Sequence, residues 1–325
     1  MKIPNTLIHE ILHNANLMPI LVDVGASGDP PPVWQPLGKQ ATYIGFDPDE
    51  REIRDVADGI FGRSILINKA VTDKSSAESV KFYLTKSPYC SSTLKPNQQI
   101  LNNYLYADLF SIEREVDVPA TTLNQTVEQL NLPRLDWIKL DSQGVDLRLL
   151  DSLDDSLFDQ VMAVDIEPGL IPFYEDENLF TDLHSYLTAK GFWLSDMTIK
   201  GSARMQATNL STLEPNSLKR QDFERRMKHT PGWVEARYLR NLSHITTRDQ
   251  HLLLWAFALL DQQIGFALDV ALQAKAQFGD DAISGKMIAG VLDLHRPSAT
   301  QQLTNTLRQL LPTPVKHQLR KLLGI

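Results

Sequence analysis

The sequence predicts an α/β protein whose core is a largely parallel sheet. Short apolar runs with strand character alternate with segments of helical periodicity, the βαβα order in which crossover helices cover a parallel sheet. The ends of these runs carry polar and often acidic residues, namely Asp23, Asp47, Asn68, Asp141 and Glu167. Because ligands of such sheets collect at the carboxyl ends of the strands, we expect these residues to surround the site.

The expected elements follow from the spacing of apolar residues along the chain. A short amphipathic helix comes first, because Leu7, Ile8, Ile11 and Leu12 recur at helical spacing. The main strands are expected at residues 20–24, 42–46, 64–67, 137–140, 161–166 and 192–194. Helices are expected at residues 49–57, 99–109, 123–130, 145–153 and 179–190. Residues 80–84 have the pattern of a hairpin strand, and a turn-rich loop with adjacent serines follows at 87–97.

Composition limits the classes of function. The chain has 325 residues, 42% of them hydrophobic, which is enough for one large domain with an appendage. Its net charge of −8 argues against a surface that tracks nucleic-acid phosphates. The single cysteine, Cys90, excludes an intrachain disulfide and a cysteine zinc site, and the eight histidines show no metal-binding spacing. We therefore expect no metal centre of these kinds, while a hard cation held by carboxylates stays open.

Targeting and membrane signals are weak in this sequence. The first residues lack the basic start and long apolar core of a secretory signal. The longest apolar run, residues 252–260, is too short to span a bilayer and is followed by polar residues. The expectation is a cytoplasmic protein without a transmembrane segment.

The turn at residues 21–30 (LVDVGASGDP) is the most informative feature for function. A strand-end acid, Asp23, and a second one, Asp47, flank a glycine turn, an arrangement typical of nucleoside-binding α/β domains. Dinucleotide sites place three glycines and cradle a pyrophosphate with free N–H groups. Here Asp29 would repel a phosphate, and the prolines at 30–32 have no N–H to donate. S-adenosylmethionine carries a sulfonium cation and no phosphate, so the turn favours it over NAD.

Five separated motifs, in order, resemble the FkbM family of S-adenosylmethionine-dependent methyltransferases over about residues 18–242. They are DVGASG at 23–28, GFDPD at 45–49, WIKLDSQGVDLRLL at 137–150, the segment 167–192, and WVEARYLRNL at 233–242. The resemblance implies a Rossmann-like class I methyltransferase sheet with flanking helices. The chain departs from the family pattern at Asp29, where relatives often carry a second glycine, and at Asp146, where glutamate is usual.

The resemblance also implies a set of residues that bind the cofactor. Asp47 would accept hydrogen bonds from both ribose hydroxyls, and Asp23 would hold the amino group directly or through water. Asn68 would border the adenine. The loop beneath the methionine end would comprise Gly25, Ala26, Ser27 and Gly28. The alternative roles are structural and involve no ligand: Asp47 would be a turn or cap residue before Pro48, and Asn68 would be a turn asparagine.

Asp141 and Glu167 are the candidate catalytic residues, because they are expected on adjacent strand ends. Either carboxylate could remove the proton of an acceptor hydroxyl or orient the acceptor. Lys139, two residues before Asp141, is expected to pair with a nearby acid. The alternative for Glu167 is a structural acid bonded to loop N–H groups.

Two domains are expected, a methyltransferase domain at residues 1–245 and a helical C-terminal extension at 246–325. Residues 251–278 have the pattern of one long or bent helix interrupted at Gly265, and residues 301–325 carry leucines near helical spacing beside basic residues. This extension would pack on the domain, form a homo-oligomer or contact a membrane surface. Residues 200–228 are polar and charged, and are expected outside the sheet as a solvated helix or an acceptor-facing insertion.

The function expected from these observations is methyl transfer from S-adenosylmethionine to a hydroxyl of a sugar, glycolipid, polysaccharide or secondary metabolite. The partner is then a small-molecule or glycan acceptor and not a nucleic acid. Two alternatives stay open: a methyltransferase-like protein that binds without catalysis, and a Rossmann enzyme that uses NAD or a nucleotide sugar.

Overall fold

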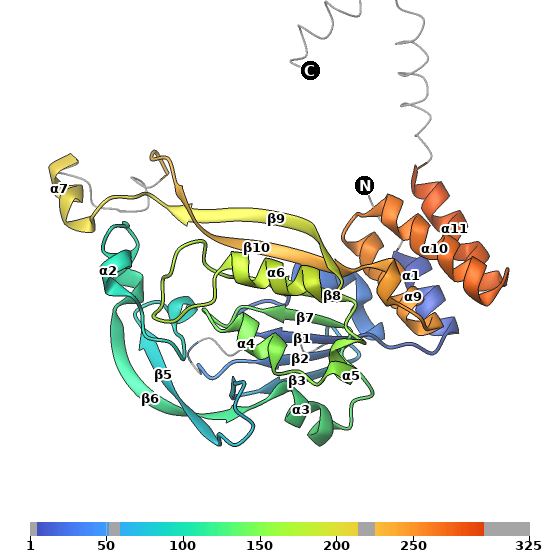
Figure 1. Cartoon of the computed structure of the whole chain (residues 1–325), viewed down its shortest axis with the longest axis horizontal. Coiled ribbons are helices and arrows are strands. Elements are labelled where there is room, and N and C mark those ends of the chain that lie inside the picture. The colour runs from blue at the N-terminus through green and yellow to red at the C-terminus, as the bar shows by residue number, and fades with distance from the viewer. Residues whose placement is uncertain (1–4, 50, 52–58, 214–224, 296–325) are drawn as a thin grey trace, which may run out of the picture.

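The computed structural model describes residues 5–49, 51, 59–213 and 225–295, and it confirms the predicted fold class. A seven-stranded sheet runs in the order β3-β2-β1-β7-β8-β10-β9, with helices on both faces and further helices at the C-terminal end (Figure 1). Its strands are β1 (Ile20–Val24), β2 (Thr42–Phe46), β3 (Arg63–Ile67), β7 (Trp137–Leu140), β8 (Ala163–Ile166), β9 (Phe192–Ser202) and β10 (Thr230–Arg240). A second sheet, β4-β6-β5, comprises β4 (Ala70–Val71), β5 (Ser79–Thr85) and β6 (Ile112–Thr121).

The helices cover the sheet faces and the C-terminal end of the described chain. They are α1 (Asn5–Asn14), α2 (Gln98–Leu101), α3 (Leu123–Leu130), α4 (Asp146–Asp151), α5 (Asp155–Phe158), α6 (Phe180–Ala189), α7 (Leu210–Leu213), α9 (Arg248–Leu260), α10 (Ile264–Phe278) and α11 (Ala282–His295). Side chains fix where α3 and α9 begin, because Thr122 and Thr247 each accept a hydrogen bond from the backbone N–H of the glutamine three residues later.

Strand direction places a switch point between β1 and β7. The strands β3, β2, β1, β7 and β8 are parallel, whereas β10 is antiparallel to both β8 and β9. From β1 the chain builds the sheet outward through β2 and β3, and it then returns to add β7 on the other side of β1. In open α/β sheets, a crevice forms outside the carboxyl ends of the strands at such a reversal.

Side chains along each strand point alternately to the two faces of the sheet, so two hydrophobic cores form, one on each face. Val22, Ile138 and Val164 point to the face covered by α3, α4 and α6. The opposite face carries Leu21 and Trp137 and packs against α1, α9 and the 3₁₀ segment Pro32–Gln40. Helix α9 lies between this face and the other C-terminal helices, so its residues from Gln250 to Leu260 are all buried. The absence of a polar face in the sequence of α9 follows from this central position.

Two expected helices differ from the structure. Residues 99–109 do not form one helix: α2 ends at Leu101, and a 3₁₀ turn follows at Ala107–Phe110. Tyr104, Tyr106 and Phe110 instead pack with Phe173 in an aromatic cluster, and this burial outweighs the helical periodicity. The break within 251–278 lies at 261–263 and not at Gly265, since Gln262 has a left-handed φ of 59° and Gly265 lies inside α10.

The remaining expectations are partly covered by the described residues. Strands 20–24, 42–46 and 137–140 and helix 123–130 have the predicted bounds. The strand β6 was not predicted, and β9 runs to Ser202, beyond the predicted end. The expected helix at 301–325, most of the one at 49–57, and residues 214–224 of the 200–228 segment lie outside the described residues. The 200–228 segment was expected outside the sheet, but its first residues extend β9 to Ser202, and α7 follows at Leu210–Leu213. The boundary between the domains 1–245 and 246–325 stays a prediction, because α9, α10 and α11 share one hydrophobic cluster with the sheet.

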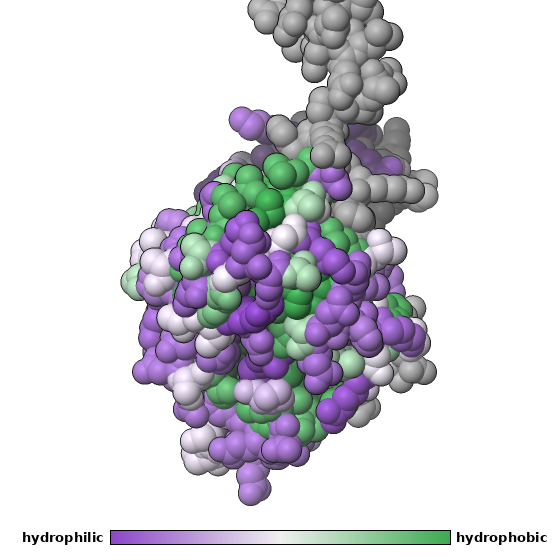
Figure 2. Space-filling model, turned by 90° about the vertical axis from the view of Figure 1, so that its right-hand side faces the viewer, coloured by the Kyte–Doolittle hydropathy of each residue, from purple (hydrophilic) through white to green (hydrophobic). Residues whose placement is uncertain are grey.

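Figure 2 shows the side of the molecule on which the C-terminal helices lie, with apolar residues gathered over their end. Leu272 of α10 and Leu292 of α11 are about half exposed, at 48% and 49%. Within the described part of the chain, no helix is long and apolar enough to cross a bilayer.

Arg240 at the end of β10 provides a test of the fold. Its guanidinium is buried, lies 4.0 Å from the ring centroid of Phe192, and donates hydrogen bonds to the carbonyls of Val161, Lys190 and Phe158. Replacing it by methionine (Arg240→Met) removes three hydrogen bonds from a buried site, although the Phe158 carbonyl still accepts from the Val161 N–H, and should lower the free energy of unfolding by about 2–4 kcal/mol. Urea denaturation measures the loss. The matched control is Arg114→Met on the exposed face of β6, and an equal loss in both variants would contradict the assignment.

Candidate functional site

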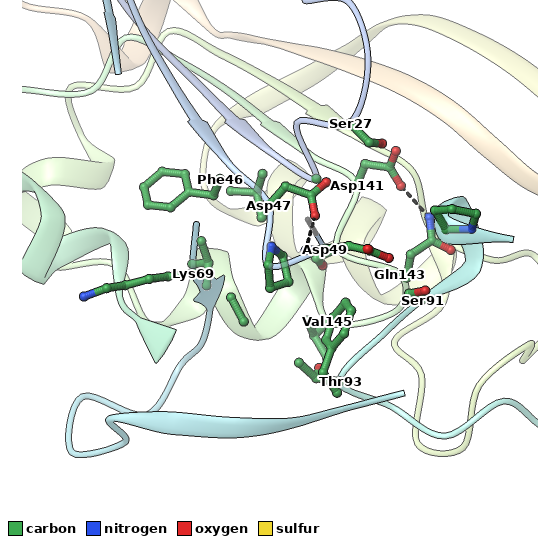
Figure 3. A pocket seen from close by; sticks show the side chains of 18 of the residues that line it. Ser27, Phe46, Asp47, Asp49, Lys69, Ser91, Thr93, Asp141, Gln143 and Val145 are labelled. Atoms are coloured by element: carbon green, nitrogen blue, oxygen red, sulfur yellow. Dashed lines mark hydrogen bonds between the residues drawn. The ribbon is translucent and has the colours of Figure 1, made fainter. Parts of the chain in front are cut away.

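A cleft opens at the carboxyl ends of β1, β2 and β7, at the switch point of the sheet. It holds about 610 Å³ of space when its open mouth is included. Figure 3 shows Asp47 and Asp141 from two different strand ends lining it, with Phe46 and Val145 among the apolar residues. Further apolar lining comes from Val24, Ala70, Val71 and Phe82. We call this cavity the cofactor cleft.

The glycine turn joins the three strand ends that form the cleft. Gly25 has a φ of +81°, and a Cβ there would lie 2.3 Å from the carbonyl oxygen of Asp141. The N–H groups of Gly25 and Ala26 both donate to the carbonyl of Phe46 at 2.9 Å. A side chain at position 25 would therefore push β1 away from β7, which explains the glycine.

Asp47 combines a structural and a ligand-facing role. One carboxylate oxygen, Oδ1, accepts a hydrogen bond of 2.8 Å from the backbone N–H of Asp49, as the turn alternative expects. The same side chain lines the cleft, where Figure 3 shows it beside Asp141. Burial, with added repulsion from neighbouring carboxylates, raises the pKa of Asp47 to about 6. At neutral pH it is charged and has acceptor capacity left for a ligand.

A second cavity lies on the other side of the Ser27 turn, over the face of the sheet that carries Asp23. It holds about 900 Å³ including its mouth. The residues lining it are Asp23, Ser27, Asp29, Pro31, Pro32, Lys139, Leu140, Asp165, Ile166, Glu167, Asp196, Thr198, Glu235, Ala236 and Arg237. We call it the acidic groove. Because Ser27 lines both cavities, the groove and the cofactor cleft meet at this turn.

Charges alternate across the strands that form the floor of the groove. Asp23 of β1 is in register with Lys139 of β7, which is in register with Asp165 of β8, and Asp165 pairs with Arg237 of β10. The Arg237 guanidinium donates to Asp165 at 2.7 and 3.0 Å, and to Asp261 of the α9 end at 2.8 Å. These two carboxylates raise the pKa of Arg237 against the opposing effect of burial.

Lys139 connects the two cavities electrostatically. Its ammonium lies 3.0 Å from Asp23 Oδ1 in the groove and 3.8 Å from Asp141 Oδ2 in the cleft. Asp23 also accepts a hydrogen bond of 3.0 Å from the Tyr43 hydroxyl. Burial raises the pKa of Asp23, and Lys139 and Tyr43 oppose that rise. The predicted pairing of Lys139 with a nearby acid is therefore confirmed.

Glu167 follows β8 and lines the groove close to the cleft. Burial, and then the charge of Asp141, raise the pKa of Glu167 to about 9. Its backbone N–H donates to Asp146, which also accepts from Ser142. Asp146 thus ties the ends of β7 and β8 together, although its side chain is one methylene shorter than the glutamate of the family pattern.

The loop at 87–97 forms one wall of the cleft. Ser91 and Thr93 line the cavity, and the Ser92 hydroxyl donates to the Gln143 carbonyl at 2.7 Å. Gln143 in turn donates to Asp141 at 2.6 Å, which holds the carboxylate in place. The Tyr174 hydroxyl lies 2.8 Å from the side-chain oxygen of Gln143, so the loop after β8 also supports this contact.

The predicted site residues divide between the two cavities. Gly25, Ser27, Asp47 and Asp141 line the cofactor cleft, whereas Asp23 and Glu167 line the groove. Ala26 is buried within the turn and Gly28 takes a φ of +85°, and neither belongs to the lining of the cofactor cleft or of the groove. Asn68 is exposed and lies outside the lining, while its neighbour Lys69 belongs to it.

Several contributing residues gave no recognisable signal in the sequence. Val71 and Phe82 reach the cleft from the small sheet, whose strand β4 has only two residues. Glu177 accepts hydrogen bonds from the N–H groups of Gly169 and Tyr174, and burial raises its pKa to about 7. Among the described residues, no group of three His, Cys, Asp or Glu side chains is placed to hold a metal ion.

Comparison with known proteins gives one family match, and it covers part of the chain that carries the candidate site. Residues 38–194 match the family model of the methyltransferase FkbM domain. This stretch contains Asp47, Asp141 and Glu167, and the match supports a methyltransferase in general. No curated protein and no solved structure matches the chain significantly.

Removing the cation between the cavities should produce a pH-dependent loss of stability. The variant Lys139→Met leaves Asp23 buried without its cation, and we expect a loss of about 3 kcal/mol in the free energy of unfolding at neutral pH. Because protonation neutralises Asp23, this loss should be small near pH 4 and grow as the pH rises. Urea denaturation over that range measures it.

The control for this prediction is the double variant Asp23→Asn/Lys139→Met, which removes both charges. It should recover a large part of the stability that the single variant loses. A loss that is equal at all pH values, or that the double variant does not reduce, would contradict the bridging role of Lys139.

Proposed function

We propose that this chain, which carries an FkbM methyltransferase domain, uses S-adenosylmethionine to methylate a hydroxyl of a sugar, glycolipid, polysaccharide or secondary metabolite. The observation that carries the proposal is the pair of carboxylates Asp47 and Asp141, which face one cleft from the ends of β2 and β7. When bound there, S-adenosylmethionine supplies a methyl group on a positively charged sulfur, and a neutral thioether remains after transfer.

The lining of the cleft fits this cofactor. Two carboxylates suit ribose hydroxyls and an ammonium group, and Phe46, Val71 and Val145 provide apolar contact for an adenine ring. Among the described lining residues Lys69 is the only cation, and Figure 3 shows its side chain directed away from both carboxylates. A pyrophosphate would therefore meet negative charge without a compensating donor, which disfavours NAD and nucleotide sugars.

The roles of the acids follow from where they lie. Asp47 would accept from the ribose hydroxyls through the acceptor positions that Asp49 leaves open. Asp141, fixed by Gln143, would hold the amino group of the cofactor. Asp23 already accepts hydrogen bonds from Lys139 and Tyr43. It would therefore influence the amino group of the cofactor only indirectly, by balancing the charge of Lys139 or through a water molecule.

Glu167 is the proposed general base. It lines the groove that meets the cleft at Ser27, so an acceptor in the groove would lie between Glu167 and the cleft. The ionised Glu167 carboxylate would take the proton of the acceptor hydroxyl while the hydroxyl oxygen bonds to the methyl carbon and the bond between that carbon and sulfur breaks. Its raised pKa makes Glu167 a strong base once ionised, and a cation bound nearby would lower that pKa toward neutrality.

Asp47→Asn tests the cofactor site. We expect the affinity for S-adenosylhomocysteine to fall by about 10- to 100-fold, because a charged acceptor of two hydrogen bonds is lost. In the wild type the affinity should also fall as the pH drops through about 6, where Asp47 takes up a proton, and the variant should lack this dependence. Calorimetric titration measures both effects. Asp117→Asn on exposed β6 is the control, and equal affinities in the two variants would refute the assignment.

Glu167→Gln tests the proposed base and separates a catalyst from a protein that only binds. Turnover should fall by about 10²- to 10⁴-fold, while the affinity for S-adenosylhomocysteine stays within about twofold. Release of S-adenosylhomocysteine, measured with an acceptor that the wild type methylates, reports turnover. The wild-type rate should rise with pH toward the pKa of Glu167, and the variant should lack that rise. Unchanged turnover would exclude Glu167 as the base.

A further inference from the structure

We infer that the acidic groove selects an acceptor that carries a protonated amine, such as an amino sugar, and rejects acceptors that carry carboxylates or phosphates. This inference rests on the proposed function, because it assigns the acceptor to the cavity beside the cofactor cleft. It names the substrate class from the charge of the groove, which the family match does not determine.

The groove is placed as an acceptor site should be. It is a second cavity, of about 900 Å³ when its open mouth is included, beside the cofactor cleft. It meets the cofactor cleft at Ser27, and Leu140 of its lining directly precedes Asp141 of the cleft. The hydroxyl to be methylated would lie at this junction, near Glu167, and the rest of the acceptor would extend toward β9 and β10.

The positive charges of the groove are already matched. Its described lining contains six acidic side chains, including the largely protonated Glu167, and two cations, Lys139 and Arg237. Lys139 is held by Asp23 and Asp141, and Arg237 by Asp165 and Asp261. Neither cation is therefore available to bind an anionic acceptor without losing a buried partner.

Negative charge remains at the rim. Asp29, Asp196 and Glu235 are exposed residues of the groove lining, on the turn after β1 and on the paired strands β9 and β10. Glu235 pairs with Lys200 at 3.1 Å, but both side chains are close to half exposed, and such surface ion pairs contribute little to the free energy of folding. The Asp196 carboxylate accepts only from its neighbouring backbone N–H of Met197 among the contacts the structure shows. A cation entering the groove would meet carboxylates from all three elements.

The spacing of these acids favours an organic ammonium over a metal ion. Within the described part of the chain, no three acidic or histidine side chains converge closely enough to hold a metal. Carboxylates spread around a cavity instead raise the local concentration of cations and steer them inward. A protonated amine on a sugar ring can use such a rim while its hydroxyl reaches the junction.

An ammonium group in the groove would also assist catalysis. The pKa of Glu167 is raised by burial and by Asp141, so the free protein holds Glu167 largely protonated at neutral pH. A positive charge nearby favours the ionised carboxylate and lowers its pKa. A cationic acceptor would in this way increase the fraction of protein in which the base is ready, whereas an anionic acceptor would decrease it.

Three trisaccharides that differ in charge test the inference. The probes are the β-1,4-linked trimers of glucosamine and N-acetylglucosamine, and a trimer of galacturonic acid. Each is titrated by calorimetry into the full-length protein saturated with S-adenosylhomocysteine, slightly below neutral pH so that the amines are protonated. We expect the glucosamine trimer to bind about tenfold more tightly than the acetylated trimer, and the acidic trimer to bind most weakly. Added salt should reduce the preference.

Rim variants show whether this preference belongs to the groove. Asp29→Asn/Asp196→Asn should reduce the preference for the glucosamine trimer by about threefold or more while leaving the affinity for S-adenosylhomocysteine unchanged. Glu115→Gln, an exposed acid on β6 that pairs with Lys81, is the matched control and should change neither. Equal binding of the three trimers, binding of none, or a preference that the rim variant retains would overturn the inference. Failure of the wild type to bind S-adenosylhomocysteine would instead refute the proposed function.

Discussion

The position of Lys139 between Asp23 and Asp141 is the interaction on which the two cavities depend. Three parallel strands end at this point, and each brings acidic groups to the same edge of the sheet. Buried carboxylates cost free energy unless a cation or hydrogen bonds compensate them. A single ammonium at 3.0 Å from one carboxylate and 3.8 Å from the other lets Asp23 and Asp141 lie close together. It thereby keeps negative charge available for ligands on both sides of the Ser27 turn.

At the same edge of the sheet, backbone contacts fix the strand ends, and most of the carboxylates that face the cavities are not needed for this. Gly25 permits the close approach of β1 and β7, and the N–H groups of the turn bind the end of β2. These contacts fix three strand ends without using the carboxylates that face the cavities. Asp146 holds the loop after β7 through the Ser142 N–H, and Asp146 and Glu177 hold the loop after β8 through the N–H groups of Glu167, Gly169 and Tyr174. The acids that would contact ligands are therefore distinct from most of the acids that support the loops.

Much of the fold could be predicted because it follows from local patterns. The strands at 20–24, 42–46 and 137–140 are mostly apolar, which is the pattern of parallel strands buried on both faces, and only Asp23 and Lys139 interrupt them with a charge. The strand-end acids were also predictable, because direction along the chain places them at one edge. The expected helix at 99–109 was wrong because Tyr104 and Tyr106 pack against Phe173, a residue distant in sequence.

The division into a cofactor cleft and an acidic groove could not be predicted from the sequence. It depends on which face of the sheet each side chain occupies and on the return of β9 and β10 beside β8. Asp29, interpreted in the sequence as adverse to phosphate, proves to line the groove. The placement of Asp23 and Asp141 on two sides of Lys139 likewise required the register of β1 against β7.

The central claim is that the cleft between Asp47 and Asp141 binds a sulfonium nucleoside and not a dinucleotide. Parallel calorimetric titrations of the full-length protein with S-adenosylhomocysteine and with NAD test it most directly. We expect saturable one-to-one binding of S-adenosylhomocysteine, displaced by S-adenosylmethionine, and no detectable binding of NAD. Tight binding of NAD together with no heat from S-adenosylhomocysteine would contradict it.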